Sequence, residues 1–270
     1  MRTFAQPRLP LAWLIIWFGA ALLVSQTQLA SPDPMTLSRA LHLPGIPHLF
    51  GFDSFGRDLL ILTLKSSLIS ALFAASAVGV ATLFGILAGT TLALSPPRLL
   101  GVLLSLLDLF LAFPSLLLAL ALAAVLGPGW ITLVTALLIG IIPSYSRLVY
   151  VRARELLTED YVLAAQSFGA TRAHIAIKHL TPAVLSLCRV KAPNLFAHAL
   201  MAEATLSFLG VGAPAGRDTW GSLLLQGQAY LIEAPHIALG VGLPLVVTVL
   251  ALQALTSPDF ASRESLPKNS

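Results

Sequence analysis

The sequence has few charged residues and a single cysteine. Charged residues make up 10% of its 270 positions, whereas hydrophobic residues make up 57%. A soluble domain carries about a quarter charged residues, so the composition excludes an ordinary soluble globular protein. The lone cysteine, Cys188, excludes an internal disulfide and a cysteine-ligated metal cluster.

The sequence also lacks a phosphate-binding loop. No Gly-x-x-x-x-Gly-Lys-Ser/Thr run occurs in it, and such a run is what cradles nucleotide phosphates. We therefore assign no catalytic, cofactor-binding or metal-ligating residue and do not expect an enzyme. His42, His48, His198 and His236 lack the spacing of metal ligands on one helix.

A net charge of +4 could indicate a nucleic-acid partner. The basic residues instead sit in short loops between apolar runs, as charge-directed membrane orientation requires. We therefore expect no nucleic-acid binding.

Long apolar runs dominate what is present. Several reach the ~18 residues that indicate a transmembrane helix. The sequence predicts an all-α, polytopic membrane protein with about six transmembrane helices. The expected spans are residues 9–26, 66–94, 99–126, 130–150, 182–212 and 236–255.

These spans predict the organisation of the chain. Residues 1–65 form an N-terminal transmembrane helix and an extracytoplasmic segment. Residues 66–258 form the transmembrane core, which contains a polar loop at 151–181, and residues 259–270 form a short polar tail. The N-terminal span resembles the start of a signal peptide, but its cleavage site is poor, so we expect it to be retained.

The distribution of basic residues predicts the orientation. One side of the predicted membrane domain carries ten: Arg2, Arg8, Arg98, Arg147, Arg152, Arg154, Arg172, Lys178, Arg263 and Lys268. The other side carries four: Arg39, Arg57, Lys65 and Arg217. Because cytoplasmic loops are the richer in Lys and Arg, both termini and the polar loop are predicted to be cytoplasmic.

The polar loop has helical spacing. Asp160 is suited to cap a helix start, and Tyr161, Ala164, Ala165 and Phe168 then fall on one helical face. Small alanines beside one large apolar side chain favour close contact with another protein. The alternative is a helix lying on the membrane surface.

The rest of the loop suggests a second short helix. Gly169 is placed to end the first helix, residues 171–178 are expected to form the second, and Pro182 to start the next span.

The loop resembles the cytoplasmic motif of permeases of the type I importer class of ABC transporters. That motif reads Glu-Ala-Ala, three residues, Gly, with Leu-Pro further on. Here Leu163 replaces the acid, Ala164, Ala165 and Gly169 match, and His179-Leu-Thr-Pro182 replaces the His-x-Leu-Pro ending of one subfamily.

Further motifs resemble the dipeptide/oligopeptide/nickel permeases, and in particular their C-type subunit. The run from Gly51 to Asp58 is similar to Gly-Thr-Asp-x-x-Gly-Arg-Asp, with Phe52 in place of the threonine. The run from Glu203 to Gly212 is similar to Glu-Ala-x-Leu-Ser-Phe-Leu-Gly-Leu-Gly. Trp220-Gly221, and Asp108 followed by Phe-Pro-Ser at 113–115, also match. The usual Gly-Asp-x-Leu-Arg-Asp tail is missing.

This resemblance implies one half of a translocation pathway in the bacterial inner membrane. The implied partners are a second, non-identical permease, two cytoplasmic ATPases that bind ATP and Mg²⁺, and an extracytoplasmic substrate-binding protein. The cargo would be a peptide or a nickel or metallophore complex. The implied ATPase-coupling residues are Asp160, Tyr161, Ala164, Ala165, Phe168, Gly169, His179 and Pro182.

Several charged residues keep two interpretations open. Asp108 and Glu203 either line the pathway or bond neighbouring helices, and Arg189 and Lys191 either reach the membrane interface or form a basic ring in the pathway. The outer motif is either a salt-bridged turn or a contact for the outer gate or the binding protein. Its residues are Gly51, Asp53, Gly56, Arg57 and Asp58.

Two other functional classes remain as alternatives. A secondary transporter driven by an ion gradient would show internal repeats around a midplane site, and no convincing repeat is present. A membrane scaffold that recruits a cytoplasmic protein would use the polar loop but would leave the outer motif unexplained.

Overall fold

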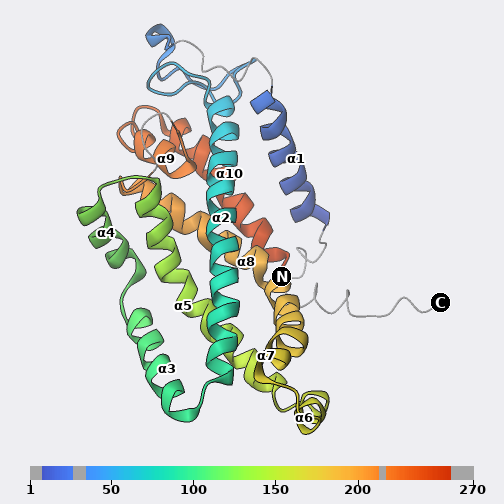
Figure 1. Ribbon diagram of the computed structural model, residues 1–270. Helices are drawn as coiled ribbons and strands as arrows, with labels where there is room; N and C mark the ends of the chain where they lie inside the picture. The colour runs from blue at the N-terminus through green and yellow to red at the C-terminus, as the bar shows by residue number, and fades with distance from the viewer. Residues whose placement is uncertain (1–7, 27–34, 213–216, 257–270) are drawn as a thin grey trace, which may run out of the picture.

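The computed structural model describes residues 8–26, 35–212 and 217–256, and these are built from helices (Figure 1). The one β-type pairing within these ranges is an isolated antiparallel bridge between Phe52 and Asp58. The predicted all-α class is therefore confirmed. The C-terminal tail lies outside the described residues.

The longest helices run between the two ends of the molecule (Figure 1). Two short helical turns accompany the α-helices: a 3₁₀ turn at Leu37–Arg39, between α1 and α2, and a π-helical turn at Ala176–Leu180, between α7 and α8. The α-helices are α1 (Arg8–Gln26), α2 (Leu59–Leu94), α3 (Pro97–Ala112), α4 (Ser115–Leu126), α5 (Trp130–Leu156), α6 (Asp160–Ser167), α7 (Arg172–Ile175), α8 (Thr181–Phe208), α9 (Trp220–Gln228) and α10 (Pro235–Ala254).

Four helices are long and apolar enough to cross a membrane: α1, α2, α5 and α10. The bent pair α3 and α4 counts as a fifth span if its two helices act together. The remaining predicted span, α8, has 28 residues but is interrupted by polar ones such as Lys191, Asn194 and Glu203. Its crossing of the membrane stays a prediction.

The predicted third span is not one straight helix. It divides at Phe113 and Pro114, and the axes of its two halves differ by 83°. Proline cannot donate the backbone hydrogen bond that a continuous helix needs at this point, and the residue before it is pushed toward an extended conformation.

Helix α2 is the central column of the fold (Figure 1). It begins at Leu59, earlier than the predicted start at Ser66, because Asp58 caps it by accepting from the backbone N–H of Ile61 at 3.1 Å. It packs against α1, α5 and α8. Gly89 brings α2 close to α5, since a Cβ there would lie 2.5 Å from the side chain of Val149.

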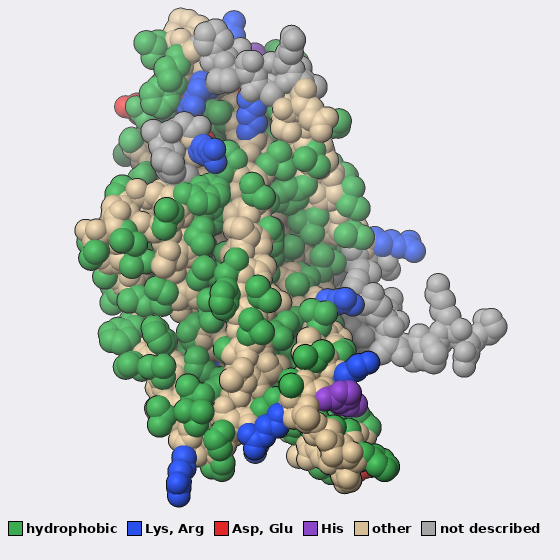
Figure 2. All heavy atoms as spheres, in the orientation of Figure 1, with side chains coloured by type: hydrophobic (Ala, Val, Ile, Leu, Met, Phe, Trp, Pro, Cys, Tyr) green, Lys and Arg blue, Asp and Glu red, His purple; other side chains and the backbone are tan. Residues whose placement is uncertain are grey.

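The surface pattern fits a membrane protein. In Figure 2 hydrophobic side chains cover the middle of the molecule, and many Lys and Arg side chains lie toward its two ends. Exposed large apolar residues on the long helices include Ile16, Leu83, Leu87, Ile131 and Leu250. An apolar surface of this extent is suited to contact with lipid.

Candidate functional site

The polar loop forms a compact projection at one end of the molecule, made of α6 and α7 (Figure 1). Three apolar side chains hold it to the body: Val162, Ile175 and Leu180 are 0–3% exposed. They share one apolar cluster with Val149 of α5 and Val184 of α8. The projection is therefore fixed to the long helices by packing.

The predicted contact face of α6 is largely exposed. Tyr161 is 48% exposed and Phe168 is 91% exposed, while Ala164 is exposed and Ala165 half-buried between them. These are the four residues that the helical spacing placed on one face. A small apolar surface with one protruding aromatic ring is available there for contact with another molecule.

Gly169 ends α6 as predicted. Its φ of +82° lies in the left-handed region, which favours glycine. The N–H of Gly169 donates to Gln166 O at 2.9 Å, and the N–H of Ala170 donates to Ala165 O at 3.0 Å. This pair of bonds is a Schellman motif and fixes where the chain leaves the helix.

The prediction that Asp160 caps α6 is wrong. The N-cap is Glu159, whose side chain makes no capping bond, and Asp160 is the first helical residue. A carboxylate in the first turn still stabilises the helix, because it faces the positive end of the helix dipole.

The second short helix and the next span are continuous. Thr171 caps α7 by accepting from the N–H of His174 at 3.2 Å, and the π-helical turn then leads directly into α8. Pro182 is the second residue of α8, so it starts this span as predicted, although the π-helical turn continues the helix upstream of it. It has no N–H to donate, and π-turns inside helices commonly mark such sites.

Contacts between rings connect α6 with this helical run. The rings of Tyr161 and His179 have centroids 5.8 Å apart, and those of His174 and His179 are 5.9 Å apart. Arg172 also donates to the carbonyl of Leu94, the last residue of α2, at 3.4 Å. The projection is thus tied to α2 and α8, so that displacement of α6 would be transmitted to both helices.

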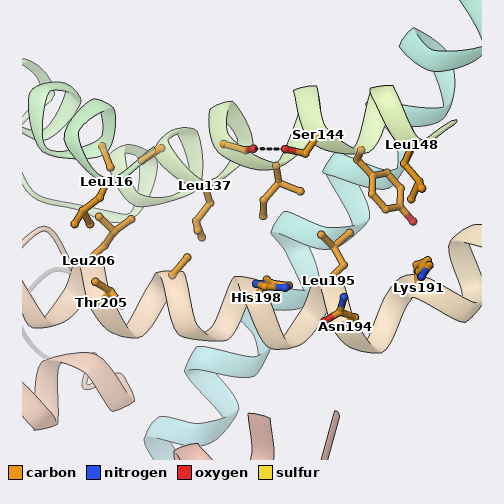
Figure 3. A pocket seen from close by; sticks show the side chains of 16 residues that line it. Leu116, Leu137, Ser144, Leu148, Lys191, Asn194, Leu195, His198, Thr205 and Leu206 are labelled. Atoms are coloured by element: carbon orange, nitrogen blue, oxygen red, sulfur yellow. Dashed lines mark hydrogen bonds between the residues drawn. The ribbon is translucent and has the colours of Figure 1, made fainter. Parts of the chain in front are cut away.

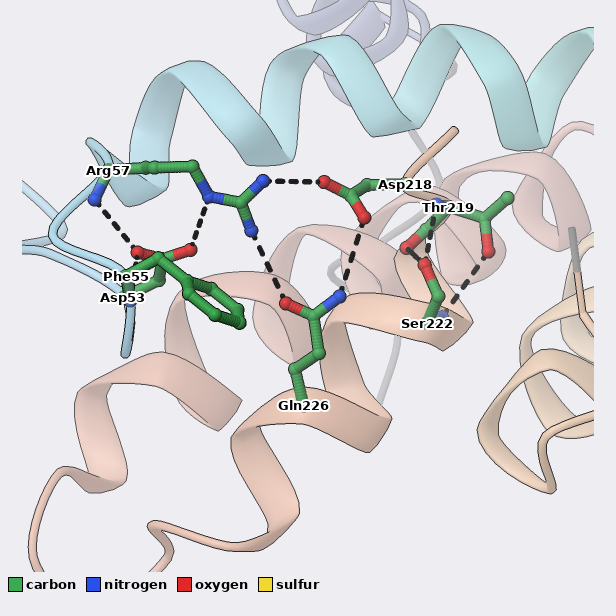
Figure 4. A network of polar contacts seen from close by, with 7 residues as sticks. All are labelled: Asp53, Phe55, Arg57, Asp218, Thr219, Ser222 and Gln226. Atoms are coloured by element: carbon green, nitrogen blue, oxygen red, sulfur yellow. Dashed lines mark hydrogen bonds and ion pairs between the residues drawn. The ribbon is translucent and has the colours of Figure 1, made fainter. Parts of the chain in front are cut away.

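The opposite end of the molecule holds the outer motif. Asp53 is 4% exposed. Its carboxylate accepts from the N–H groups of Phe55 and Arg57 at 2.9 and 2.8 Å, and from Arg57 Nε at 2.7 Å (Figure 4). The motif is therefore a salt-bridged turn in which Arg57 neutralises a buried carboxylate.

The same arginine reaches a distant segment. Arg57 NH1 donates to Asp218 Oδ2 at 3.1 Å, and NH2 donates to Gln226 Oε1 at 3.3 Å (Figure 4). The two outer segments are joined through this side chain. Sequence analysis did not identify Asp218 or Gln226, because nothing in the sequence pairs residues so far apart in the chain.

The last residues of the motif complete the turn before α2. Asp58 both caps α2 and contacts His48, with 2.6 Å between Oδ2 and Nδ1. Gly51 has φ +74°, and a Cβ on it would lie 2.6 Å from the carbonyl of His42. His42 and His48, which could have suggested a metal site, are therefore part of this turn. Within the described residues no group of three His, Cys, Asp or Glu is arranged to hold a metal ion.

The motif that begins at Glu203, together with Trp220, forms a buried cluster between α2, α8 and α9. Glu203 is fully buried, and its Oε1 accepts from Ser207 Oγ at 2.7 Å. Trp220, also fully buried, donates from Nε1 to Thr63 O at 3.1 Å and from its backbone N–H to Ser70 Oγ at 3.1 Å. In the described structure Glu203 is thus buried among these helices and its Oε2 has no hydrogen-bond partner, and whether it also lines the pathway stays a prediction.

The remaining charges of the long helices differ in their surroundings. Asp108 of α3 pairs with Arg147 of α5, and this contact connects the two helices. Lys191 lines a cavity of about 610 Å³ between α4, α5 and α8 (Figure 3). Arg189 and Lys191 are both exposed, but Arg189 is not among the residues that line the cavity.

Comparison with known sequences covers most of the chain. Residues 81–259 match the family described as the binding-protein-dependent transport system inner membrane component. A Brucella suis protein described as a candidate peptide transport system permease is 34% identical over 92% of this chain and 83% of its own length.

Two further relatives have similar levels of identity. The dipeptide transport system permease protein DppC of Alkalihalophilus pseudofirmus is 33% identical over 90% of this chain and 79% of its own length. The glutathione transport system permease protein GsiD of Pectobacterium atrosepticum is 33% identical over 78% of this chain and 70% of its own length.

Proposed function

Since the chain belongs to the binding-protein-dependent transport system inner membrane components and is a permease subunit of an ABC importer, we propose that the exposed face of α6 receives the ATPase and that the cargo is a peptide. The main support is the position of Phe168, 91% exposed at the tip of a projection whose other side is buried against α5 and α8.

The projection is suited to transmit force. Its outer face offers Ala164, a side chain small enough for close approach, beside the protruding Phe168. Its inner side is held by Val162 and Ile175, so a rigid-body movement of the ATPase would carry the ends of α2 and α8 with it. His179 contacts Tyr161 and supports α6 from the side of α8.

Peptide cargo is supported by the names of the relatives. They are described as permeases for peptides, dipeptides and glutathione, itself a small peptide. Peptide is therefore favoured over nickel or a metallophore. The secondary-transporter and scaffold alternatives receive no support from these relatives.

The proposed assembly contains a second, non-identical permease, two ATPases and an extracytoplasmic binding protein. ATP and Mg²⁺ would bind to the ATPases, because the sequence of this chain contains no phosphate-binding loop. The assembly would lie in the bacterial inner membrane with α6 and both termini in the cytoplasm. The outer motif and α9 would then face the binding protein.

The decisive experiment truncates the protruding ring. Phe168→Ala removes a side chain that is 91% exposed, so it should leave the fold intact. The ATPases should then co-purify at least about tenfold less, because a central aromatic anchor is often worth more than ~1.4 kcal/mol of binding. Uptake of radiolabelled trialanine by the reconstituted transporter should fall in parallel.

Ile232→Ala is the matched control. Ile232 is 97% exposed and lies at the opposite end of the molecule from α6, so its truncation should leave ATPase recovery unchanged. Gly169→Asp should give a stronger defect, because φ at this position is +82°. Full ATPase recovery and normal uptake with both α6 variants would refute the coupling assignment.

A further inference from the structure

Polar residues of α8 form a stripe along one side of the helix. This stripe consists of four of the polar residues of α8, namely Lys191, Asn194, His198 and Thr205, at intervals of three, four and seven residues. Intervals of this kind place side chains on one face of an α-helix. Helix α8 starts at Thr181, so Lys191 lies ~15 Å and His198 ~25 Å along its axis. Both lie well inside the helix.

This stripe faces the cavity between α4, α5 and α8. Figure 3 shows Lys191, Asn194 and His198 on the α8 side of the space, across from Leu137 and Leu148 of α5. The residues that line the cavity include no aspartate or glutamate. The cavity therefore has its lysine on the α8 side, and its α5 side is mainly apolar, with the hydroxyl groups of Ser144 and Tyr145 as exceptions.

Lys191 lacks a partner of opposite charge. Among the described residues no carboxylate lies within ion-pair distance of its ammonium, which is also true of most cations on the surface of the molecule. A cation within a membrane helix is costly unless it faces a cavity or binds an anion. The cavity provides the first condition, and its volume leaves room for a ligand that would provide the second.

Arg189, the cation nearest to Lys191 in the sequence, points in a different direction. Arg189 is two residues earlier, which corresponds to a rotation of about 200° around an α-helix, and it does not line the cavity. The two cations that sequence analysis grouped together therefore have different surroundings. Only the side chain of Lys191 is available to a ligand in this cavity.

We propose that Lys191, with Asn194 and His198 as neighbouring hydrogen-bond donors, binds the carboxylate of the cargo while the apolar wall of α5 accommodates its side chains. An ammonium group and a carboxylate form a charge-assisted hydrogen bond. This inference rests on the proposed function, since it identifies the group by which a peptide would be held during transport.

Direct binding to the assembled transporter, without the binding protein, tests the proposal. Saturation-transfer NMR would give dissociation constants for trialanine and for trialanine amide, whose C-terminus carries no charge. The transporter should bind trialanine at least about tenfold more tightly than the amide, and Lys191→Gln should remove this difference. Lys191→Arg should restore part of it, and Arg189→Gln should leave it unchanged.

Three outcomes would overturn the proposal: no detectable trialanine binding by the unsubstituted transporter, equal affinity for acid and amide, or an unchanged preference in Lys191→Gln. A preference that depends on the anionic lipid content of nanodiscs and not on the cargo terminus would assign Lys191 to a lipid headgroup and also contradict it. Trialanine uptake tests the proposed function separately, since a transporter that imports trialanine but fails these criteria would refute only the carboxylate site.

Discussion

Arg57 and Asp218 are 161 positions apart in the chain and are joined by an ion pair of 3.1 Å near the N-terminal end of α2. The same guanidinium neutralises Asp53, a carboxylate with a side chain only 5% exposed. One side chain thus serves a local turn and a long-range connection. The two roles have different energetic consequences, and each can be measured.

Substitution of Arg57 by glutamine should destabilise the transporter strongly. It leaves the buried carboxylate of Asp53 without its cation, which costs about 3 kcal/mol. Asp218→Asn should cost less than about 1 kcal/mol, because Asp218 is partly exposed. Denaturant titration of both single variants and the double variant would give the coupling energy. Strictly additive effects would show that the ion pair between the two segments contributes no stability.

Two glycines with similar backbone angles should respond differently to alanine. Gly56 has φ +74°, and a Cβ on it would lie 2.1 Å from Thr36 O, whereas Gly169 has φ +82° with no atom within 4 Å of a new Cβ. Gly169→Ala should therefore cost about 1 kcal/mol for the left-handed backbone alone. Gly56→Ala requires the outer loop to move and should abolish accumulation of folded protein. Thermal stability of both variants can be measured by size-exclusion chromatography after heating. Equal stability of Gly56→Ala and Gly169→Ala would contradict this packing.

The buried bond between Ser207 and Glu203 should be important for stability. Ser207→Ala removes the donor to a carboxylate with no exposed surface, and a loss of about 2 kcal/mol is expected. Ser186→Ala is the matched control, because this serine also donates within α8, to Ala183 O at 2.7 Å, but is exposed. The two unfolding midpoints should differ clearly, and coincident midpoints would mean that the bond adds nothing.

The contact between Asp108 and Arg147 predicts the result of a charge swap. Asp108→Arg places two cations together between α3 and α5 and should lower the yield of folded protein. The double variant Asp108→Arg and Arg147→Asp restores opposite charges and should recover most of the loss. Yield and melting temperature of the purified subunit measure this. A double variant that is no better than Asp108→Arg alone would show that the contact does not hold α3 to α5.

Local features account for what the sequence predicted well. Gly169 ends α6 as predicted, because glycine adopts the left-handed backbone conformation without steric cost. The predicted helix boundaries were wrong where capping or proline residues nearby in the chain outweighed the pattern of apolar residues. Asp160 is inside α6 rather than at its cap, Ser66 lies within α2, and Pro114 bends a run that composition alone reads as one span.

By itself the sequence determined the class of protein, its main apolar spans and its family motifs. These properties depend on composition and order within windows of ~20 residues, which the apolar thickness of a bilayer makes decisive. Only the tertiary structure decided that Glu203 is buried, that Arg57 reaches Asp218, and that Lys191 rather than Arg189 lines the cavity. Side chains of successive residues in an α-helix point in directions that differ by about 100°. Which direction meets a cavity, a partner or lipid depends on how the distant helices pack.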